Sequence, residues 1–158
     1  MLSFKNRNGS LQTADRNMVE IKINYEGELQ CVNTHGPSKT TCVTDAPVDN
    51  NGRGLSFSPT DLLATALGSC MATIMGIVAD RKDLDLEGMI ITVGKHMSDD
   101  MPRRIARIDV RIEMPLSEDH PQRKILESSA LSCPVHQSIH PDVEVPIEWC
   151  WKSKEYSS

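Results

Sequence analysis

The apolar run LLATALGSCMATIMGIVA occupies residues 62–79 and decides how the rest of the chain is organised. It carries no charged side chain, and its length lies at the lower edge of the about 17–25 residues that cross a bilayer. One interpretation is therefore a membrane span. The run is single, rich in Gly, Ala, Ser and Thr, and bounded by Asp61 and Asp80, which favours a helix buried all round in a globular protein. Because a small domain rarely surrounds such a helix alone, burial by a second subunit is expected.

The start and the faces of this helix are marked in the sequence. Ser58 is suited to cap it, Pro59 fits the first helical position, and Asp61 stands where a capping-box carboxylate reaches back. Helical spacing predicts a smooth strip that admits close approach of another helix or of backbone, made of Ala64, Gly68, Ala72 and Gly76. Cys70 is predicted on the opposite face, among Leu63, Leu67, Ile74 and Ile77.

Length and charge limit what the protein can be. The 158 residues favour one domain over 1–158, with a core at about 18–151, a flexible N-terminus at 1–16 and a C-terminal tail at 152–158. A net charge of −5, from 17 basic and 22 acidic residues, argues against nucleic acid or membrane lipid as partner. With two residues each of Trp, Tyr and Phe, a base-stacking platform is not expected.

The five cysteines contain no CxxC pair, so a zinc ribbon is poorly supported. The N-terminal residues MLSFKNR lack the apolar segment of a signal peptide, which predicts a reducing, cytoplasmic location with free thiols. Three cysteines fall in predicted strands and are interpreted as small packed residues: Cys31, Cys42 and Cys150.

The remaining segments predict strands around helices, in a single α+β domain. The strands are expected at 18–25 and 28–34, which form a hairpin through Glu26-Gly27, and at 40–45, 87–97, 103–114 and 142–151. A loop is expected at 46–57, an amphipathic helix at 118–131, and a short helical turn from Cys133-Pro134.

Two segments carry possible chemistry: Gly68-Ser69-Cys70 within the helix, and Ser132 to His136. A thiol reacts as its thiolate, which needs positive charge or hydrogen-bond donors nearby. Cys133 stands to gain from the free N–H groups of the turn that Pro134 begins, whereas Cys70 lies inside its helix. From the residues alone, a redox pair and two structural thiols both remain open.

The run SPTDLLATALGSC at 58–70, followed downstream by Cys133-Pro134-Val135, resembles the OsmC/Ohr family, over about 25–150 of the chain. The resemblance implies an α+β fold with antiparallel sheets around a long buried apolar helix. It also implies an intertwined homodimer with sites at the subunit interface.

The same resemblance implies a thiol-dependent peroxidase that acts in oxidative stress defence. Cys70 would be the peroxidatic thiolate and Cys133 the resolving thiol, with organic hydroperoxides as substrates, a dithiol as reductant, and no metal or organic cofactor. The candidate substrate-binding residues are Phe57, Thr60, Met71 and His136.

The sequence departs from the family pattern at the activating groups. Family members carry Glu directly after the Pro of the helix motif, where this chain has Thr60. Asp61 stands one residue later, and capping is favoured over catalysis for it. The activating arginine of the family is matched best by Arg53, with Arg103 or Arg104 as the next choices.

Two alternatives come from other classes of function. One is a non-catalytic module that binds a hydrophobic ligand or partner at the dimer groove. The other is a metal site made of Cys133, His136 and His140, with Asp142 as a fourth ligand, although His136 also suits a proton partner of Cys133.

Overall fold

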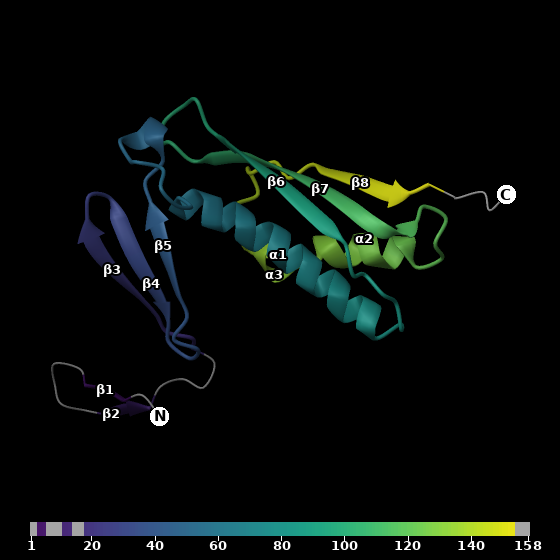
Figure 1. Cartoon of the computed structure of the whole chain (residues 1–158), viewed down its shortest axis with the longest axis horizontal. Coiled ribbons are helices and arrows are strands. Elements are labelled where there is room, and N and C mark those ends of the chain that lie inside the picture. The colour runs from purple at the N-terminus through teal and green to yellow at the C-terminus, as the bar shows by residue number, and fades with distance from the viewer. Residues whose placement is uncertain (1–2, 6–10, 14–17, 154–158) are drawn as a thin grey trace. The chain divides into compact units, whose positions relative to one another are not determined.

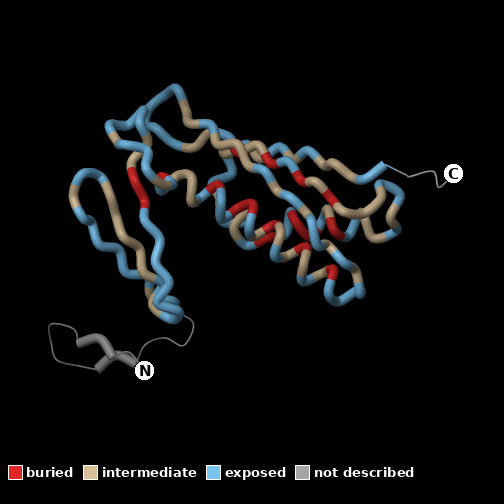
Figure 2. Tube along the Cα trace, in the orientation of Figure 1, coloured by how far each residue is buried: buried red, intermediate tan, exposed pale blue. Residues whose placement is uncertain are grey.

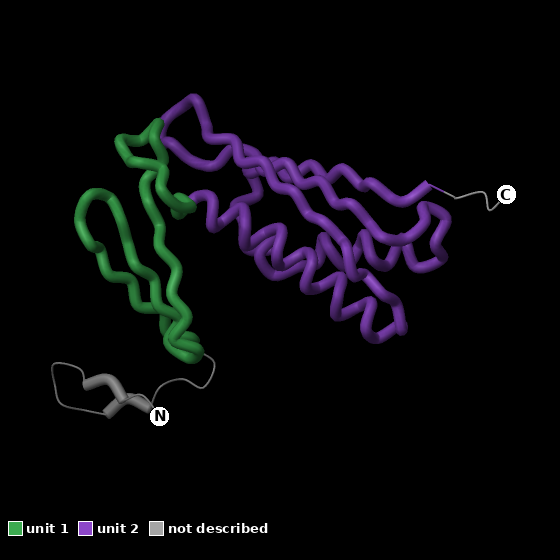
Figure 3. The backbone as a smooth tube through the Cα atoms, viewed as in Figure 1, with its two compact units in different colours: residues 1–59 green, residues 60–158 purple. Residues whose placement is uncertain are grey.

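A computed structural model describes the backbone of residues 3–5, 11–13 and 18–153, and the side chains from residue 18 to 153. The chain divides into two compact units, residues 1–59 and 60–158, and each is described by itself (Figure 3). The flexible ends expected at 1–16 and 152–158 fall largely outside the described residues. Their described parts include strands β1 (Ser3–Lys5) and β2 (Leu11–Thr13), which pair in an antiparallel hairpin.

The N-terminal unit contains an antiparallel sheet in the order β3-β4-β5 (Figure 1). Its strands are β3 (Ile21–Gly27), β4 (Gln30–His35) and β5 (Thr41–Asp45). The predicted hairpin is confirmed, but its turn lies two residues further along the chain than Glu26-Gly27. Glu28 and Leu29 take the turn, with φ of 48° and 63°, the positive values that a tight hairpin needs.

The segment after β5 is the expected loop, with one short 3₁₀ turn at Val48–Asn50. Asp45 is fully buried and holds the far end of the loop. Its backbone N donates to the Phe57 carbonyl at 3.1 Å, and its Oδ2 accepts from the Leu55 N at 3.0 Å. The loop is therefore folded back on the end of β5.

The C-terminal unit packs three helices on one face of a three-stranded sheet (Figure 1). The helices are α1 (Pro59–Asp80), α2 (Arg123–Leu131) and α3 (Pro134–Ser138), and the strands are β6 (Ile90–Met97), β7 (Ile105–Ser117) and β8 (Ile147–Lys152). Helix α1 begins at Pro59 as predicted. Helix α2 begins later than residue 118, because a residue before proline, here His120 before Pro121, disfavours helical backbone.

The expectation of purely antiparallel sheets is wrong for the last strand. β6 pairs with β7 antiparallel, but β8 pairs with β7 parallel, with Ile112 opposite Trp149. Helices α2 and α3 lie between β7 and β8 in sequence, and a crossover of this length returns the chain in its original direction.

One side of α1 forms the core with the inner face of β7 (Figure 2). The alternation predicted for residues 103–114 is confirmed, since inward and outward side chains of β7 differ in burial. By length and composition α1 is also apolar enough to cross a membrane, but here it is a core helix. The fully or nearly buried residues of this core include Ala64, Leu67, Met71, Met75, Ala79, Ile108, Val110, Ile112 and Met114.

The expectation that α1 is buried all round is wrong within this chain. Leu63 and Ile77 are 42% and 41% exposed on its other side. The smooth strip does admit a close neighbour, which is strand β6: a Cβ on Gly68 would lie 3.1 Å from Val93 Cγ1. Leu67, expected on the Cys70 face, lies in the core instead.

The outer face of the C-terminal sheet carries ion pairs. Arg107 bonds Asp109 at 2.7 Å, and Asp109 also bonds His96 Nε2 at 2.6 Å. Arg111 reaches Glu148 on β8 at 3.2 Å. We call these five residues the charged sheet face.

The three strand cysteines are less buried than expected. Cys42 is exposed, so its interpretation as a packed residue is wrong, and Cys31 and Cys150 are intermediate. A period-2 pattern places a cysteine on one face of a strand, but it does not say whether that face is covered.

Candidate functional site

Cys133 lies directly before α3 and caps it. Its Sγ accepts a hydrogen bond from the His136 backbone N at 3.3 Å, and its side chain is completely buried. Burial raises the pKa of the Cys133 thiol above its usual value, and neighbouring Cys70 raises it further, whereas the backbone N–H groups of His136 and Val135 lower it. The expected N–H donors are present, but they do not activate the thiol, because desolvation outweighs them.

Cys70 lies next to Cys133 in the C-terminal unit. It is half-buried in the middle of α1, packs against the core that contains Cys133, and lies close enough to Cys133 to help raise the pKa of its thiol. Both are free thiols. The fold therefore brings together the two cysteines that the sequence singled out as a pair.

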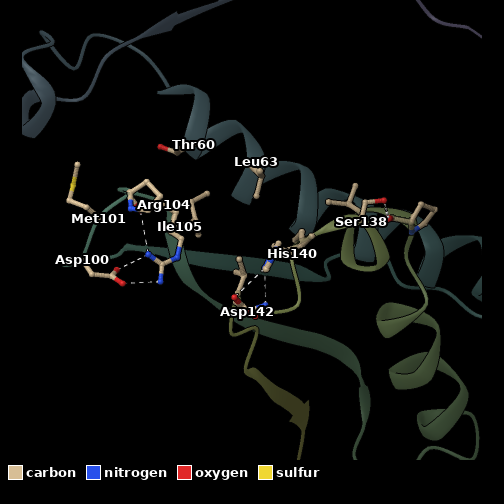
Figure 4. Close-up of a pocket in the computed structure, with 14 residues that line it drawn as sticks. Thr60, Leu63, Asp100, Met101, Arg104, Ile105, Ser138, His140 and Asp142 are labelled. Carbon is tan, nitrogen blue, oxygen red and sulfur yellow. Dashed lines mark hydrogen bonds and ion pairs between the residues drawn. The ribbon is translucent and has the colours of Figure 1, made fainter.

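A cavity of about 970 Å³ lies in the C-terminal unit, and its described lining includes neither Cys70 nor Cys133 (Figure 4). Pro134 and Val135, which directly follow Cys133, form part of its wall, as does Leu63 of α1. Leu63 is about two helical turns before Cys70, on the same side of α1. The rest of the lining combines apolar side chains with charged, histidine and hydroxyl groups: Thr60, Asp100, Met101, Pro102, Arg104, Ile105, Ser138, Ile139, His140, Asp142 and Val143.

Thr60 lines this cavity from the first turn of α1, where it meets a lysine of the sheet. The Lys95 ammonium donates to Thr60 Oγ1 at 2.8 Å and to Asp61 Oδ1 at 2.6 Å. The Lys95 side chain is only 17% exposed, whereas the Asp61 side chain is 40% exposed. The carboxylate of Asp61 thus joins α1 to β6.

The other sequence-predicted site residues lie in different places. Arg53 and Phe57 belong to the N-terminal unit, where Arg53 pairs with Glu28 at 2.7 Å and Phe57 is 56% exposed. Met71 is fully buried in the core of the C-terminal unit. His136 is half-buried, and its Nδ1 has no hydrogen-bond partner among the described residues.

The metal alternative finds no support in the geometry. Across residues 18–153, no group of three His, Cys, Asp or Glu side chains is arranged to hold a metal ion. The Cys133 sulfur is engaged by a backbone N–H, and His140 lies 3.6 Å from Asp142 through its Nδ1.

Sequence reasoning missed Lys95 and most of the cavity lining. A signal for Lys95 exists: Ile91, Val93 and Lys95 alternate on one side of a strand, and a lysine on an inward side needs a carboxylate partner. The cavity itself joins α1, α3 and the β6–β7 turn, which no local pattern relates to one another.

Comparison with known proteins gives the chain its family. The family model for OsmC-like protein matches residues 52–148. A solved structure from Psychrobacter arcticus 273-4, described as an osmotic stress induced and detoxification response protein, is 42% identical, covers 87% of this chain and 99% of its own, and superposes with a TM-score of 0.79. No curated protein matches the chain.

More distant structures share the fold. The organic hydroperoxide resistance protein OsmC from Legionella pneumophila is 14% identical, with a TM-score of 0.69 over 86% of this chain and 98% of its own. OhrB of Bacillus subtilis is 13% identical, with a TM-score of 0.61 over 84% and 97%. With its two small sheets and long core helix, this chain belongs to the OsmC-like protein family.

Proposed function

We propose that this protein is a cytoplasmic thiol peroxidase that reduces organic hydroperoxides through Cys70 and Cys133. The observation that carries the proposal is the proximity of a half-buried Cys70 to a buried Cys133, both of them free thiols. A resolving thiol needs to persist as a thiol until its partner is oxidised. The names of two distant relatives with this fold, which refer to organic hydroperoxide resistance, support the same function.

The proposed reaction has three steps. The Cys70 thiolate attacks one peroxide oxygen, the O–O bond breaks, and the alkoxide takes up a proton and leaves as an alcohol, so that Cys70 becomes a sulfenic acid. The Cys133 sulfur then forms a disulfide with Cys70, and the sulfenic hydroxyl leaves as water with the Cys133 proton. An external dithiol reduces the disulfide, is itself oxidised to a disulfide, and restores both thiols.

Several roles complete this proposal. Arg53 remains the proposed activating cation, and Phe57, Thr60, Met71 and His136 remain the proposed contacts of the substrate. Among them, Thr60 has the most direct support, because its side chain lines the cavity and is held by Lys95. No cofactor enters any step.

A homodimer is the proposed assembly, within which residues 1–158 act as one domain. Along the side of α1 away from the core, residues recur at alternate spacings of three and four, the pattern of helices that pack against each other. We call this stripe the α1 seam: Leu63, Ala66, Cys70, Thr73 and Ile77. Its apolar ends are exposed, so a second copy of the seam would remove them from water and would lie beside Cys70.

The test is to treat the reduced protein with one equivalent of cumene hydroperoxide and to map its disulfides by mass spectrometry. A Cys70–Cys133 bond is expected, and Cys70→Ser should lower peroxide consumption to that of buffer. Cys42→Ser, which removes an exposed thiol of the other unit, is the matched control and should keep full activity. Absence of the disulfide together with undiminished consumption by Cys70→Ser would overturn the proposal.

A second candidate function is ligand binding without catalysis, and the size and apolar lining of the cavity favour it. It predicts that apolar molecules bind while both thiols stay inert toward peroxide.

A further inference from the structure

The N-terminal unit contains a second pair of free thiols, Cys31 on β4 and Cys42 on β5, two adjacent strands of its sheet (Figure 1). In their antiparallel register Cys31 lies opposite Thr44, and Cys42 lies opposite Asn33. Opposite residues share a face of the sheet, and so do residues two apart on one strand. The two thiols therefore lie on the same face as diagonal neighbours.

The spacing of diagonal neighbours suits a bridging atom better than a disulfide. Their Cα atoms lie about 7–8 Å apart, with the Cβ atoms somewhat closer. A disulfide needs Cα atoms about 4.4–6.8 Å apart, because its S–S bond is only about 2.05 Å long. A metal ion between two sulfurs replaces that bond with two metal–sulfur bonds of about 2.3 Å each. The sulfurs are then separated by a longer span, which the diagonal positions of Cys31 and Cys42 provide.

Both sulfurs are available to a ligand. The Cys150 sulfur donates to Glu148 Oε1 at 3.7 Å, whereas among the described residues no hydrogen bond engages the sulfur of Cys31 or Cys42. Cys31 is half-buried, and Cys42 is exposed and lines a groove of about 440 Å³. Asn33 Nδ2 donates to the Cys42 carbonyl at 3.2 Å and so ties the two strands together beside the pair.

The number of donors decides which metal fits. In the part of the chain that the structure describes, no three His, Cys, Asp or Glu side chains are arranged around one ion, so the two thiols have no third side-chain ligand of these types. Zinc takes four protein ligands in structural sites and three in catalytic ones. Soft thiolates also select Cu(I), and this monovalent ion accepts linear coordination by two of them.

We propose that Cys31 and Cys42 form a two-coordinate Cu(I) site on the sheet of the N-terminal unit. One Cu(I) ion binds both sulfurs, and each thiol releases its proton to solvent, so two protons leave and the copper keeps its oxidation state. The resulting bis-thiolate complex carries one negative charge, which water stabilises because the site is open to solvent. The site is independent of the proposed reaction, since it uses neither Cys70 nor Cys133.

The test titrates Cu(I) under anaerobic conditions into the Cys70→Ser, Cys133→Ser variant, from which the other thiol pair is absent. The chelator bathocuproine disulfonate competes for the ion and reports its free concentration by colour. One ion is expected per chain, and X-ray absorption at the copper edge should show two sulfur ligands. Absence of binding to the reduced protein would overturn the proposal. Three or four sulfur ligands would also do so, because the ion would then be shared between molecules.

Single substitutions in the same background identify the ligands. Cys42→Ser and Cys31→Ser should each weaken Cu(I) binding at least about a hundredfold, because a single remaining thiolate no longer chelates the ion. Cys150→Ser is the matched control, since Cys150 is a partly exposed strand thiol that lies opposite Glu113 on the other sheet. It should leave the affinity unchanged. An equal loss in all three variants would refute the assignment of Cys31 and Cys42 as the ligands.

Discussion

The C-terminal unit has two outer surfaces, and they differ in kind. On the charged sheet face, acidic side chains pair with basic ones, as Asp109 does with Arg107 and Glu148 does with Arg111. The α1 seam, on the helical side of the same unit, exposes Leu63 and Ile77. The first surface is made of paired polar groups that are suited to contact with water. The second exposes apolar area that a second subunit would cover. The contrast indicates which surface the proposed homodimer would bury.

The layer between these surfaces should be the most sensitive to substitution. Met71 is fully buried between α1 and the sheet, so Met71→Ala should lower the free energy of unfolding by about 2–5 kcal/mol. Denaturant unfolding measures the change. Met101→Ala removes the same atoms from a side chain that is 84% exposed, and should change it by less than about 0.5 kcal/mol. Similar losses in both variants would contradict the assignment of the core.

A substitution in the α1 seam should weaken the proposed dimer rather than the fold. Ile77→Asp places a charge on the exposed apolar seam, and we expect it to raise the dissociation constant of the dimer at least about tenfold without loss of helix content. Sedimentation at several concentrations measures the constant, and circular dichroism measures the helix. Thr65→Asp introduces the same charge at an exposed position of α1 outside the seam, and should leave the dimer intact. If the wild-type protein is a monomer, the interpretation of the α1 seam as a dimer interface is refuted.

A substitution in the charged sheet face should have the smallest effect on stability, and that effect should depend on pH. The Arg107 guanidinium, followed by His96, holds the pKa of Asp109 below its usual range. A lowered folded-state pKa stabilises the protein above the pKa of the unfolded chain, about 3.9, and this contribution is lost as the pH falls through the folded-state value. Asp109→Asn should therefore lower the Tm slightly at pH 7, and the difference should shrink as the pH falls through the lowered folded-state pKa of Asp109. A difference that grew toward low pH would contradict this sign.

Local patterns predicted most of the fold, because burial and periodicity act over short distances. The alternation of apolar and polar residues was sufficient to predict strand β7, and Ser58-Pro59 was sufficient to predict where α1 begins. The direction of β8 was not predictable in this way, since pairing order depends on the α2–α3 crossover rather than on the strand's own residues. The exposure of one side of α1 was not predictable either. The helix is apolar all round, and the sequence does not show which of its sides this chain itself covers.

The candidate site was predictable in its thiols but not in their environment. Cys70 and Cys133 were identified from their motifs, and the structure places them together. The direction of the Cys133 pKa depends on how deeply the core covers the sulfur, a property of packing. The Asp100–Arg104 pair depends on the conformation of the β6–β7 turn, which the sequence indicated only as a turn.

The parallel pairing of β8 also governs the order in which the protein can be completed during synthesis. Ile108 N and Val110 N of β7 donate to the carbonyls of Glu144 and Pro146, just before β8 begins. These donors emerge from the ribosome well before their acceptors, so the nascent chain carries an open strand edge beside an apolar face. An open edge of this kind is a template for aggregation. A chain truncated before Glu144 would lack these acceptors and retain that open edge permanently, so the last segment of the chain completes the sheet of this unit.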